Sequence, residues 1–355
     1  MSFGEPGYEE RDTIANGLSV AAKSGFTTVI LNPKTNPIID TSSLVDAVMA
    51  KANKSIVNML VCGALTKRSD GVDLAELYDM HQHGAVVFGD YKSAVNNPNL
   101  LKIALLYAQN FGGLVQSFPQ DNQIAGNGMV NEFENSTKLG LKGIPALAEE
   151  LQIARDLFIL EYTGGKLHIP TITTAKSVTL IKDAKAKGLD VSCSVSVHHL
   201  ALTDDSLEEF DSNFKVQPPL RTNADLKALR KGLKDGTVDM ITTDHQPMDI
   251  EHKNVEFDNA DYGTIGLESS FGILQNIFTT EEVVSYLTRG KSRFGIASET
   301  IKTGTKANFS LFNPEVKGVF ENVNIHSTSK NSAFIGAELT GKVYGIFIDG
   351  KLQVN

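Results

Sequence analysis

Two short segments of the sequence carry side chains that could act as acids, bases or metal ligands. Asp244-His245 follows one apolar run, and His198-His199 follows another. A carboxylate or an imidazole in such a position could transfer protons or bind a metal ion. The structural alternative is that Asp244 accepts hydrogen bonds from backbone amides, while the two histidines are packed and hydrogen-bonded. The choice depends on the elements that position these segments.

Short β-branched runs alternate with amphipathic helical stretches from about residue 12 to residue 290. This order predicts a parallel sheet with helices outside, as either a closed barrel or a doubly wound sheet. We predict seven strands, at 27–31, 55–61, 85–88, 113–116, 166–169, 190–195 and 238–242. We predict helices between them, at 12–24, 42–52, 74–83, 99–110, 144–163, 175–187 and 223–234. Asp244 and His198 then follow strand ends, where α/β barrels carry their chemistry.

The pattern of apolar and polar residues changes after about residue 303. Alternating apolar runs broken by Gly, Asn and Pro replace the strand and helix alternation. Such runs are typical of a small antiparallel β unit. We therefore divide the chain into an α/β barrel at 1–302 and a C-terminal β unit at 303–355.

Composition excludes several classes of partner. The net charge of −9 and the pI near 5.4 argue against binding to nucleic acid or to an anionic membrane. No stretch of 18 apolar residues occurs that could span a membrane. Cys62 and Cys193 lie far apart in apolar runs, as expected for reduced, buried thiols. These features predict a cytoplasmic protein.

A series of motifs then points to a family. It comprises Glu5-Pro6-Gly7, Pro33-Lys34-Thr35-Asn36-Pro37, Gly140-Leu141-Lys142-Gly143, Ala148-Glu149, Pro218-Pro219-Leu220-Arg221, Thr243-Asp244-His245 and Gly266-Leu267-Glu268. In this order, across essentially the whole chain, the series resembles the type I dihydroorotases of the amidohydrolase superfamily. The resemblance implies a TIM-type (β/α)8 barrel, here with its first strand apparently missing, and a C-terminal part of a small β-sandwich. It also implies zinc-dependent hydrolysis of dihydroorotate to carbamoyl aspartate in pyrimidine biosynthesis.

The positions that hold metal in this family carry unsuitable residues here. By resemblance, the ligand positions fall at Ser2, Tyr91, Phe118 and Thr171, none of which can replace the expected His or carboxylate. Asp244 alone remains, at the position of the family's catalytic base and last ligand. Because a catalytic zinc takes about three protein ligands, we expect no metal and treat Asp244 as vestigial. Tyr91 and Phe118 are expected to fill the vacated volume.

The substrate-binding positions are altered as well. Gly4 stands in place of the family's arginine, and Met248 in place of a histidine. Lys34 and Gln217 each replace an asparagine and are the remaining candidates for contact with a substrate. A lysine can imitate a bidentate arginine only as a point charge.

The favoured hypothesis is a dihydroorotase homologue that has lost catalysis and serves as a structural or regulatory subunit. The resemblance implies aspartate transcarbamoylase as its partner, and self-association is the other possibility. The alternative is an active dihydroorotase or related cyclic amidohydrolase that recruits Asp90, His168 and His245. A further alternative is a metal-free module that binds a small acid through Lys34. The beginning of the sequence resembles the middle of a motif, so we also expect Met1 to be an internal start.

Overall fold

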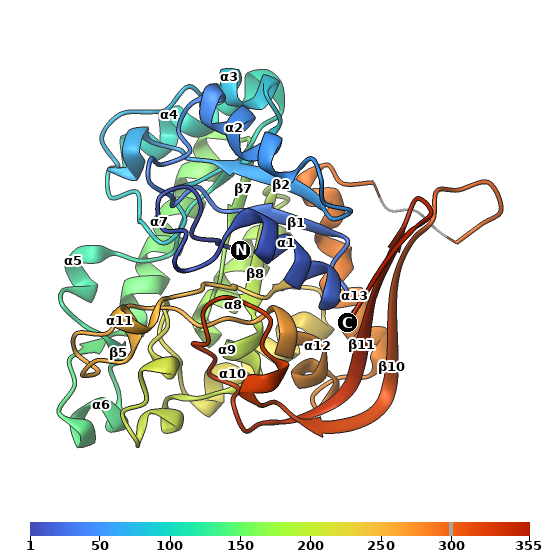
Figure 1. Cartoon of the computed structure of the whole chain (residues 1–355). Helices are drawn as coiled ribbons and strands as arrows, with labels where there is room; N and C mark the ends of the chain where they lie inside the picture. Colours follow the sequence, from blue (N-terminus) through green and yellow to red (C-terminus); the bar gives the residue numbers. More distant parts are fainter. Residues whose placement is uncertain (298–300) are drawn as a thin grey trace.

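A curled sheet of seven parallel strands forms the centre of the molecule (Figure 1). The computed structural model describes residues 1–297 and 301–355; residues 298–300, which fall within the predicted barrel unit, lie outside it. The strands follow one another in chain order, which excludes a doubly wound sheet. They are β1 (Thr28–Leu31), β2 (Asn58–Gly63), β3 (Ala85–Phe88), β4 (Leu114–Gln116), β7 (Lys166–Ile169), β8 (Val191–Ser196) and β9 (Met240–Thr242).

The predicted helices are confirmed, with small shifts at their ends. They are α1 (Ile14–Lys23), α2 (Ser42–Ala52), α3 (Leu77–Gln82), α4 (Pro98–Ala108), α7 (Ala146–Thr163), α8 (Ala175–Ala186) and α10 (Asn223–Lys234). Two further helices, α12 (Leu267–Gln275) and α13 (Thr280–Thr288), follow β9. Local sequence explains the boundaries: α10 begins at a capping box in which Thr222 and Asp225 satisfy each other's backbone amides.

Short elements lie in the loops that follow the strands. The helices are α5 (Asn122–Ala125), α6 (Glu134–Leu139), α9 (Val197–Ala201) and α11 (Ile250–Lys253), and a two-stranded sheet pairs β5 (Val130–Asn131) with β6 (Gly143–Ile144). None of the helices in the described residues is long and apolar enough to cross a membrane.

The sheet is open between β1 and β9. Each of these strands pairs with a described strand on one side only, at the position where the sequence predicted a missing strand. Met1 and Ser2 cross the opening: the amine of Met1 donates to Ile30 O at 2.9 Å, and Ser2 N donates to His245 O at 2.8 Å. Beneath them lies a cavity of about 600 Å³. It is lined by β1 and β9, by one residue each of β3, β4, β7 and β8, and by side chains of α13 and of residues 308–310, 312 and 343 in the C-terminal part.

The C-terminal strands form a separate antiparallel sheet in the order β10 (Asn308–Val319), β11 (Glu338–Ile348), β12 (Lys351–Val354). The segment between β10 and β11 returns to the barrel, where Phe320, Ile325 and Phe334 are buried in the main hydrophobic core. The long hairpin and the barrel therefore share one core.

Candidate functional site

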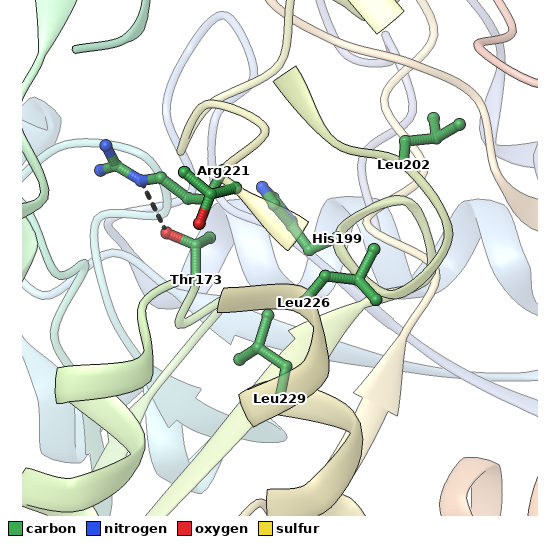
Figure 2. A pocket seen from close by; sticks show the side chains of 7 residues that line it. Thr173, His199, Leu202, Arg221, Leu226 and Leu229 are labelled. Atoms are coloured by element: carbon green, nitrogen blue, oxygen red, sulfur yellow. Dashed lines mark hydrogen bonds between the residues drawn. The ribbon is translucent and has the colours of Figure 1, made fainter. Parts of the chain in front are cut away.

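A buried polar network supports the loops above the sheet, and Figure 2 shows its hydrogen bond between Arg221 and Thr173. The carboxylate of Glu149 on α7 accepts hydrogen bonds from the amides of Thr173 and Thr174, at 2.7 and 3.1 Å, and from the hydroxyl of Ser177 at 2.7 Å. The guanidinium of Arg221 donates to the hydroxyl of Thr173 at 3.2 Å. Burial raises the pKa of Glu149, while the positive charge of Arg221 and these hydrogen bonds oppose the shift. Two motif residues of the sequence thus brace the scaffold.

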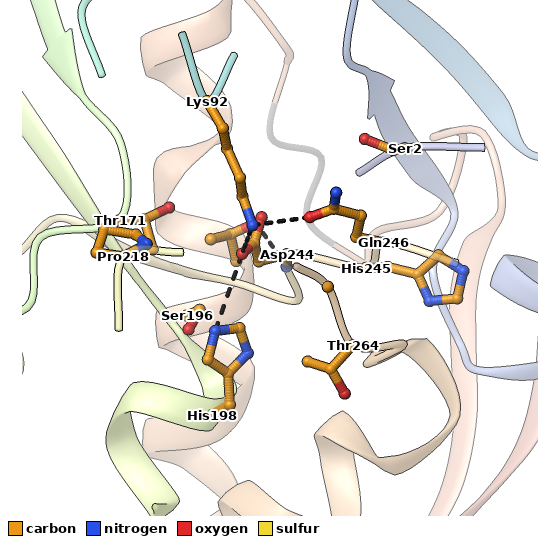
Figure 3. A network of polar contacts seen from close by, with 12 residues as sticks. Ser2, Lys92, Thr171, Ser196, His198, Pro218, Asp244, His245, Gln246 and Thr264 are labelled. Atoms are coloured by element: carbon orange, nitrogen blue, oxygen red, sulfur yellow. Dashed lines mark hydrogen bonds and ion pairs between the residues drawn. The ribbon is translucent and has the colours of Figure 1, made fainter. Parts of the chain in front are cut away.

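The retained Asp244 lies in a second buried cluster, at the end of β9 (Figure 3). The ammonium of Lys92, from the loop after β3, donates to Asp244 Oδ2 at 2.9 Å and to Gln246 Oε1 at 2.9 Å. The hydroxyl of Tyr91 donates to Asp244 Oδ1 at 3.1 Å. Both oxygens of the carboxylate are therefore engaged by neighbouring side chains.

These contacts correct the structural interpretation of Asp244. Its partners are the side chains of Lys92 and Tyr91, whereas we expected backbone amides. Sequence reasoning missed Lys92 because it concentrated on the ligand position one residue earlier. The sequence did offer a clue: Lys92 directly follows Tyr91, the position at which the resemblance predicts a carboxylate ligand.

The backbone at the top of the barrel is strained at three positions. Tyr91, Thr171 and Asp244 have φ values of 53°, 54° and 44°, in the left-handed region that non-glycine residues seldom adopt. Such conformations persist where the surrounding structure imposes them, and they cluster at functional sites. By resemblance, all three positions fall where the family is expected to bind metal, so the strain lies at the candidate site.

His198 is the imidazole nearest to this cluster. Its Nε2 lies 3.9 Å from Asp244 Oδ2 and has no hydrogen-bond partner among the described residues. Burial lowers the pKa of His198 well below its ordinary value, and the neighbouring His199 and Lys92 add to the shift. His199, by contrast, is satisfied by the Ser196 hydroxyl at 2.6 Å and by Pro218 O at 3.0 Å. The expected packing holds for both histidines, but hydrogen bonding holds only for His199.

The three residues considered as replacement ligands point to separate partners. Asp90 accepts hydrogen bonds from the amides of Leu65 and Thr66 and from the Thr66 hydroxyl, the last at 2.6 Å.

His168 and His245 are held elsewhere. The ring of His168 contacts the hydroxyls of Ser192 at 2.8 Å and Ser194 at 3.3 Å. His245 Nδ1 accepts from the amides of Gly266 and Leu267. With Asp90, these histidines form no common ligand set.

The side chains at the top of the barrel do not fit the family's zinc ions. Ser2, Tyr91, Phe118 and Thr171 supply no imidazole or carboxylate, and Asp244 is paired with an ammonium. In residues 1–297 and 301–355, no group of three or more His, Cys, Asp or Glu side chains could hold a metal ion. A zinc site needs about three such ligands.

Two aromatic side chains stand at expected ligand positions at the top of the barrel. Tyr91 and Phe118 line the cavity of about 600 Å³, together with Lys92, Thr171 and Asp244. The hydroxyl of Tyr91 lies at 3.1 Å from Asp244, and the cavity extends below both rings. That the two rings fill the volume of the expected metal ions stays a prediction.

Neither of the predicted substrate contacts, Lys34 and Gln217, forms a hydrogen bond or ion pair with Asp244. Lys34, in the loop after β1, makes no hydrogen bond or ion pair with the described residues, and part of the residue is exposed. Desolvation of its ammonium lowers the pKa of Lys34, and the positive charge of Lys92 adds to the shift. Gln217 donates to Gln120 Oε1 at 3.3 Å. At Gly4, a Cβ atom would lie 1.7 Å from Tyr8 O, so the loop itself occupies the place of an arginine side chain.

The fold matches solved structures of hydantoinases. An L-hydantoinase from Arthrobacter aurescens superposes with a TM-score of 0.81 over 94% of this chain and 78% of its own, at 22% identity. At that identity the likeness establishes the fold alone, an open α/β barrel with a C-terminal antiparallel sheet.

Sequence comparison then defines the family. The family model described as dihydro-orotase-like matches residues 1–177. The dihydroorotase of Pelotomaculum thermopropionicum is 39% identical over 98% of this chain and 83% of its own, and that of Geotalea daltonii is 37% identical over 98% and 84%. The chain belongs to the dihydroorotase family.

Proposed function

We propose that this protein is a non-catalytic member of the dihydroorotase family with a structural or regulatory role in pyrimidine biosynthesis. The observation that carries the proposal is the buried ion pair between Lys92 and Asp244, at 2.9 Å, with both side chains 4% exposed. The ammonium supplies the positive charge that Asp244 would otherwise receive from a metal ion. A metal ion would have to displace Lys92 and would then find one carboxylate where about three ligands are needed.

The changed substrate positions support the same proposal. The family arginine is absent at Gly4, and Gln217 is bonded to Gln120 rather than directed at Asp244. A bidentate grip on a carboxylate is therefore lost together with the metal ligands. If both metal binding and substrate binding are lost, the protein still has a stable fold, supported by the Glu149 network, to which a partner protein could bind.

The first experiment measures the zinc content of the purified protein and its hydrolysis of dihydroorotate with added zinc. We expect no bound zinc and no turnover, with the relative from Pelotomaculum thermopropionicum as the positive control. Two equivalents of zinc together with turnover would overturn the proposal.

The partner that we propose is aspartate transcarbamoylase, on the ground of the family resemblance. The two proteins, mixed in solution, are expected to elute together in size-exclusion chromatography. Separate elution at concentrations of about 50 μM, well above a micromolar dissociation constant, would contradict this part of the proposal.

An active dihydroorotase is the second candidate, and the identity of up to 39% to relatives of that name favours it. In that case Asp244 would act as a base after release from Lys92. Turnover that is abolished by Asp244→Asn, in protein that keeps its thermal midpoint, would establish this alternative.

A further inference from the structure

The cavity inside the barrel has a second end, opposite to Asp244. The short helix η5 (Arg289–Phe294) lies across the beginnings of the last strands. Its Arg293 donates to Leu167 O at 2.8 Å, at the beginning of β7, and to Asp190 O at 3.0 Å, directly before β8. Because η5 and the loops around Asp244 both line the cavity, the cavity extends through the barrel from one end to the other. We call the end at η5 the lower end.

Apolar side chains line the lower end. Four phenylalanines reach it from segments that lie far apart in the sequence, and each of them is partly exposed: Phe26, Phe294, Phe309 and Phe312. Leu287 of α13 lines the same end. A cavity of about 300–1,000 Å³ that is lined mainly by aromatic and aliphatic side chains is typical of a site for a small molecule. The lower end therefore favours a ligand with an apolar body.

One lysine at the lower end has no partner. Two lysines line the cavity, and the charge of Lys92 is neutralised by Asp244 at 2.9 Å. The other, Lys291 of η5, makes no hydrogen bond or ion pair with residues 1–297 and 301–355. Lys291 is also partly exposed, so a charged group bound to it stays in contact with water. Its ammonium favours an anion, and a carboxylate accepts a charge-assisted hydrogen bond from such a group.

Polar side chains line the cavity farther up, in the second halves of β4, β7 and β8. His168 of β7 and Ser194 of β8 are hydrogen-bonded to each other, at 3.3 Å. Gln116 of β4 also lines the cavity, but its side-chain amide has no hydrogen-bond partner among the described residues. An alkyl chain that covered this amide would take it out of water without a partner, which costs free energy. The apolar part of a ligand therefore ends below Gln116.

The depth of the barrel sets the length of such a ligand. Strands β1, β3 and β7 have four residues each. At ~3.3 Å per residue they span about 13 Å, which is the length of an extended chain of about ten carbons. The apolar path begins below the strands, at η5 and β10, and ends within them, so it has a similar length. A longer chain would reach Gln116.

We propose that the lower end of the barrel binds a medium-chain monocarboxylate. Its alkyl chain lies among the four phenylalanines, and its carboxylate accepts a hydrogen bond from the ammonium of Lys291. The chain enters the barrel first, so the charged head group stays at the partly exposed end. This site uses none of the positions that the resemblance assigns to metal or to substrate, and the inference is therefore independent of the proposed function.

Isothermal titration calorimetry of the full chain, with decanoate and with decyltrimethylammonium, tests the head-group contact. We expect decanoate to bind one to one with a dissociation constant below about 100 μM, and the cation to bind more weakly. Lys291→Glu should weaken decanoate at least about tenfold and strengthen binding of the cation, because the charge at the lower end changes sign. Lys176→Glu, on the exposed side of α8, is the matched control and should change neither. No binding of decanoate at about 1 mM, or an equal weakening of both probes by Lys291→Glu, would overturn the proposal.

The length of the chain tests where the ligand lies. We expect decanoate to bind more tightly than tetradecanoate, and we expect Gln116→Leu to reverse this preference, because the longer chain then meets an apolar side chain. Thr28→Phe places a ring in the cavity from β1 and should abolish binding of both acids, with unchanged circular dichroism as evidence that the variant folds. If it does not fold, the result for Gln116→Leu decides. A preference that is unchanged in Gln116→Leu, or binding of both acids to folded Thr28→Phe, would overturn the placement inside the barrel.

Discussion

The structure contains two buried clusters that each bring an acidic and a basic side chain together, and they differ in origin. In the first, Glu149 and Arg221 belong to motifs that the family resemblance identifies, and hydrogen bonds surround the carboxylate. In the second, Asp244 is such a motif residue, but its partner Lys92 stands in a loop where the family motif has changed. Under the proposed loss of catalysis, motif residues that support the fold are kept and the metal-binding positions are free to change.

The largest expected effect comes from Glu149. Glu149→Ala removes an acceptor of four hydrogen bonds and leaves Arg221 as a buried charge without its neighbour. We expect a loss of about 3–5 kcal/mol in the free energy of unfolding, measured by urea denaturation. Glu150→Ala, one residue along and partly exposed, should change it by less than about 0.5 kcal/mol. Similar losses in the two variants would remove the distinction between the clusters.

A smaller effect is expected at Lys92. Lys92→Met leaves the carboxylate of Asp244 without its cation, but Asp244 lines the cavity and can be hydrated there. We therefore expect a loss of about 2–3 kcal/mol, below the range for breaking a fully buried pair. The double variant Lys92→Met/Asp244→Asn should regain part of it, since it removes the unpaired charge. A double variant that is less stable than Lys92→Met would show that the ion pair is not the relevant interaction.

The pH dependence of stability tests the environment of His168, which lines the cavity. Burial lowers the pKa of His168 to about 3, against 6.5 in an unfolded chain. The unfolded state therefore binds more protons between these values, and stability falls as pH decreases from about 6.5. Between pH 7 and pH 5, His168 alone should account for a loss of about 2 kcal/mol.

His168→Gln, which keeps a polar side chain beside Ser192 and Ser194, should flatten that part of the profile. The urea midpoints of both proteins at the two pH values provide the measurement. An equal loss in His168→Gln would mean that water in the cavity already solvates the ring of His168. The same water would then hydrate Asp244, and the loss of stability expected for Lys92→Met would be smaller.

Much of the fold could be predicted from local patterns. The seven strands and their order follow from alternation of β-branched and amphipathic runs, and helix 42–52 and helix 223–234 have the predicted bounds. The prediction that metal ligands are replaced at Ser2, Tyr91, Phe118 and Thr171 rests on residue types at motif positions, and it stays a prediction. The cavity could not be predicted from the sequence, since the volume inside a barrel depends on how far the strands at the opening separate.

The sequence by itself determined the family, the parallel architecture and the chemical types at each motif position, because these depend on residue identity and short-range spacing. The tertiary structure alone decided which charge Asp244 meets. Lys92 and Asp244 are 152 residues apart, and only the curling of the sheet brings the ends of β3 and β9 to one point. A pattern specifies each element, but contacts between distant elements arise from packing.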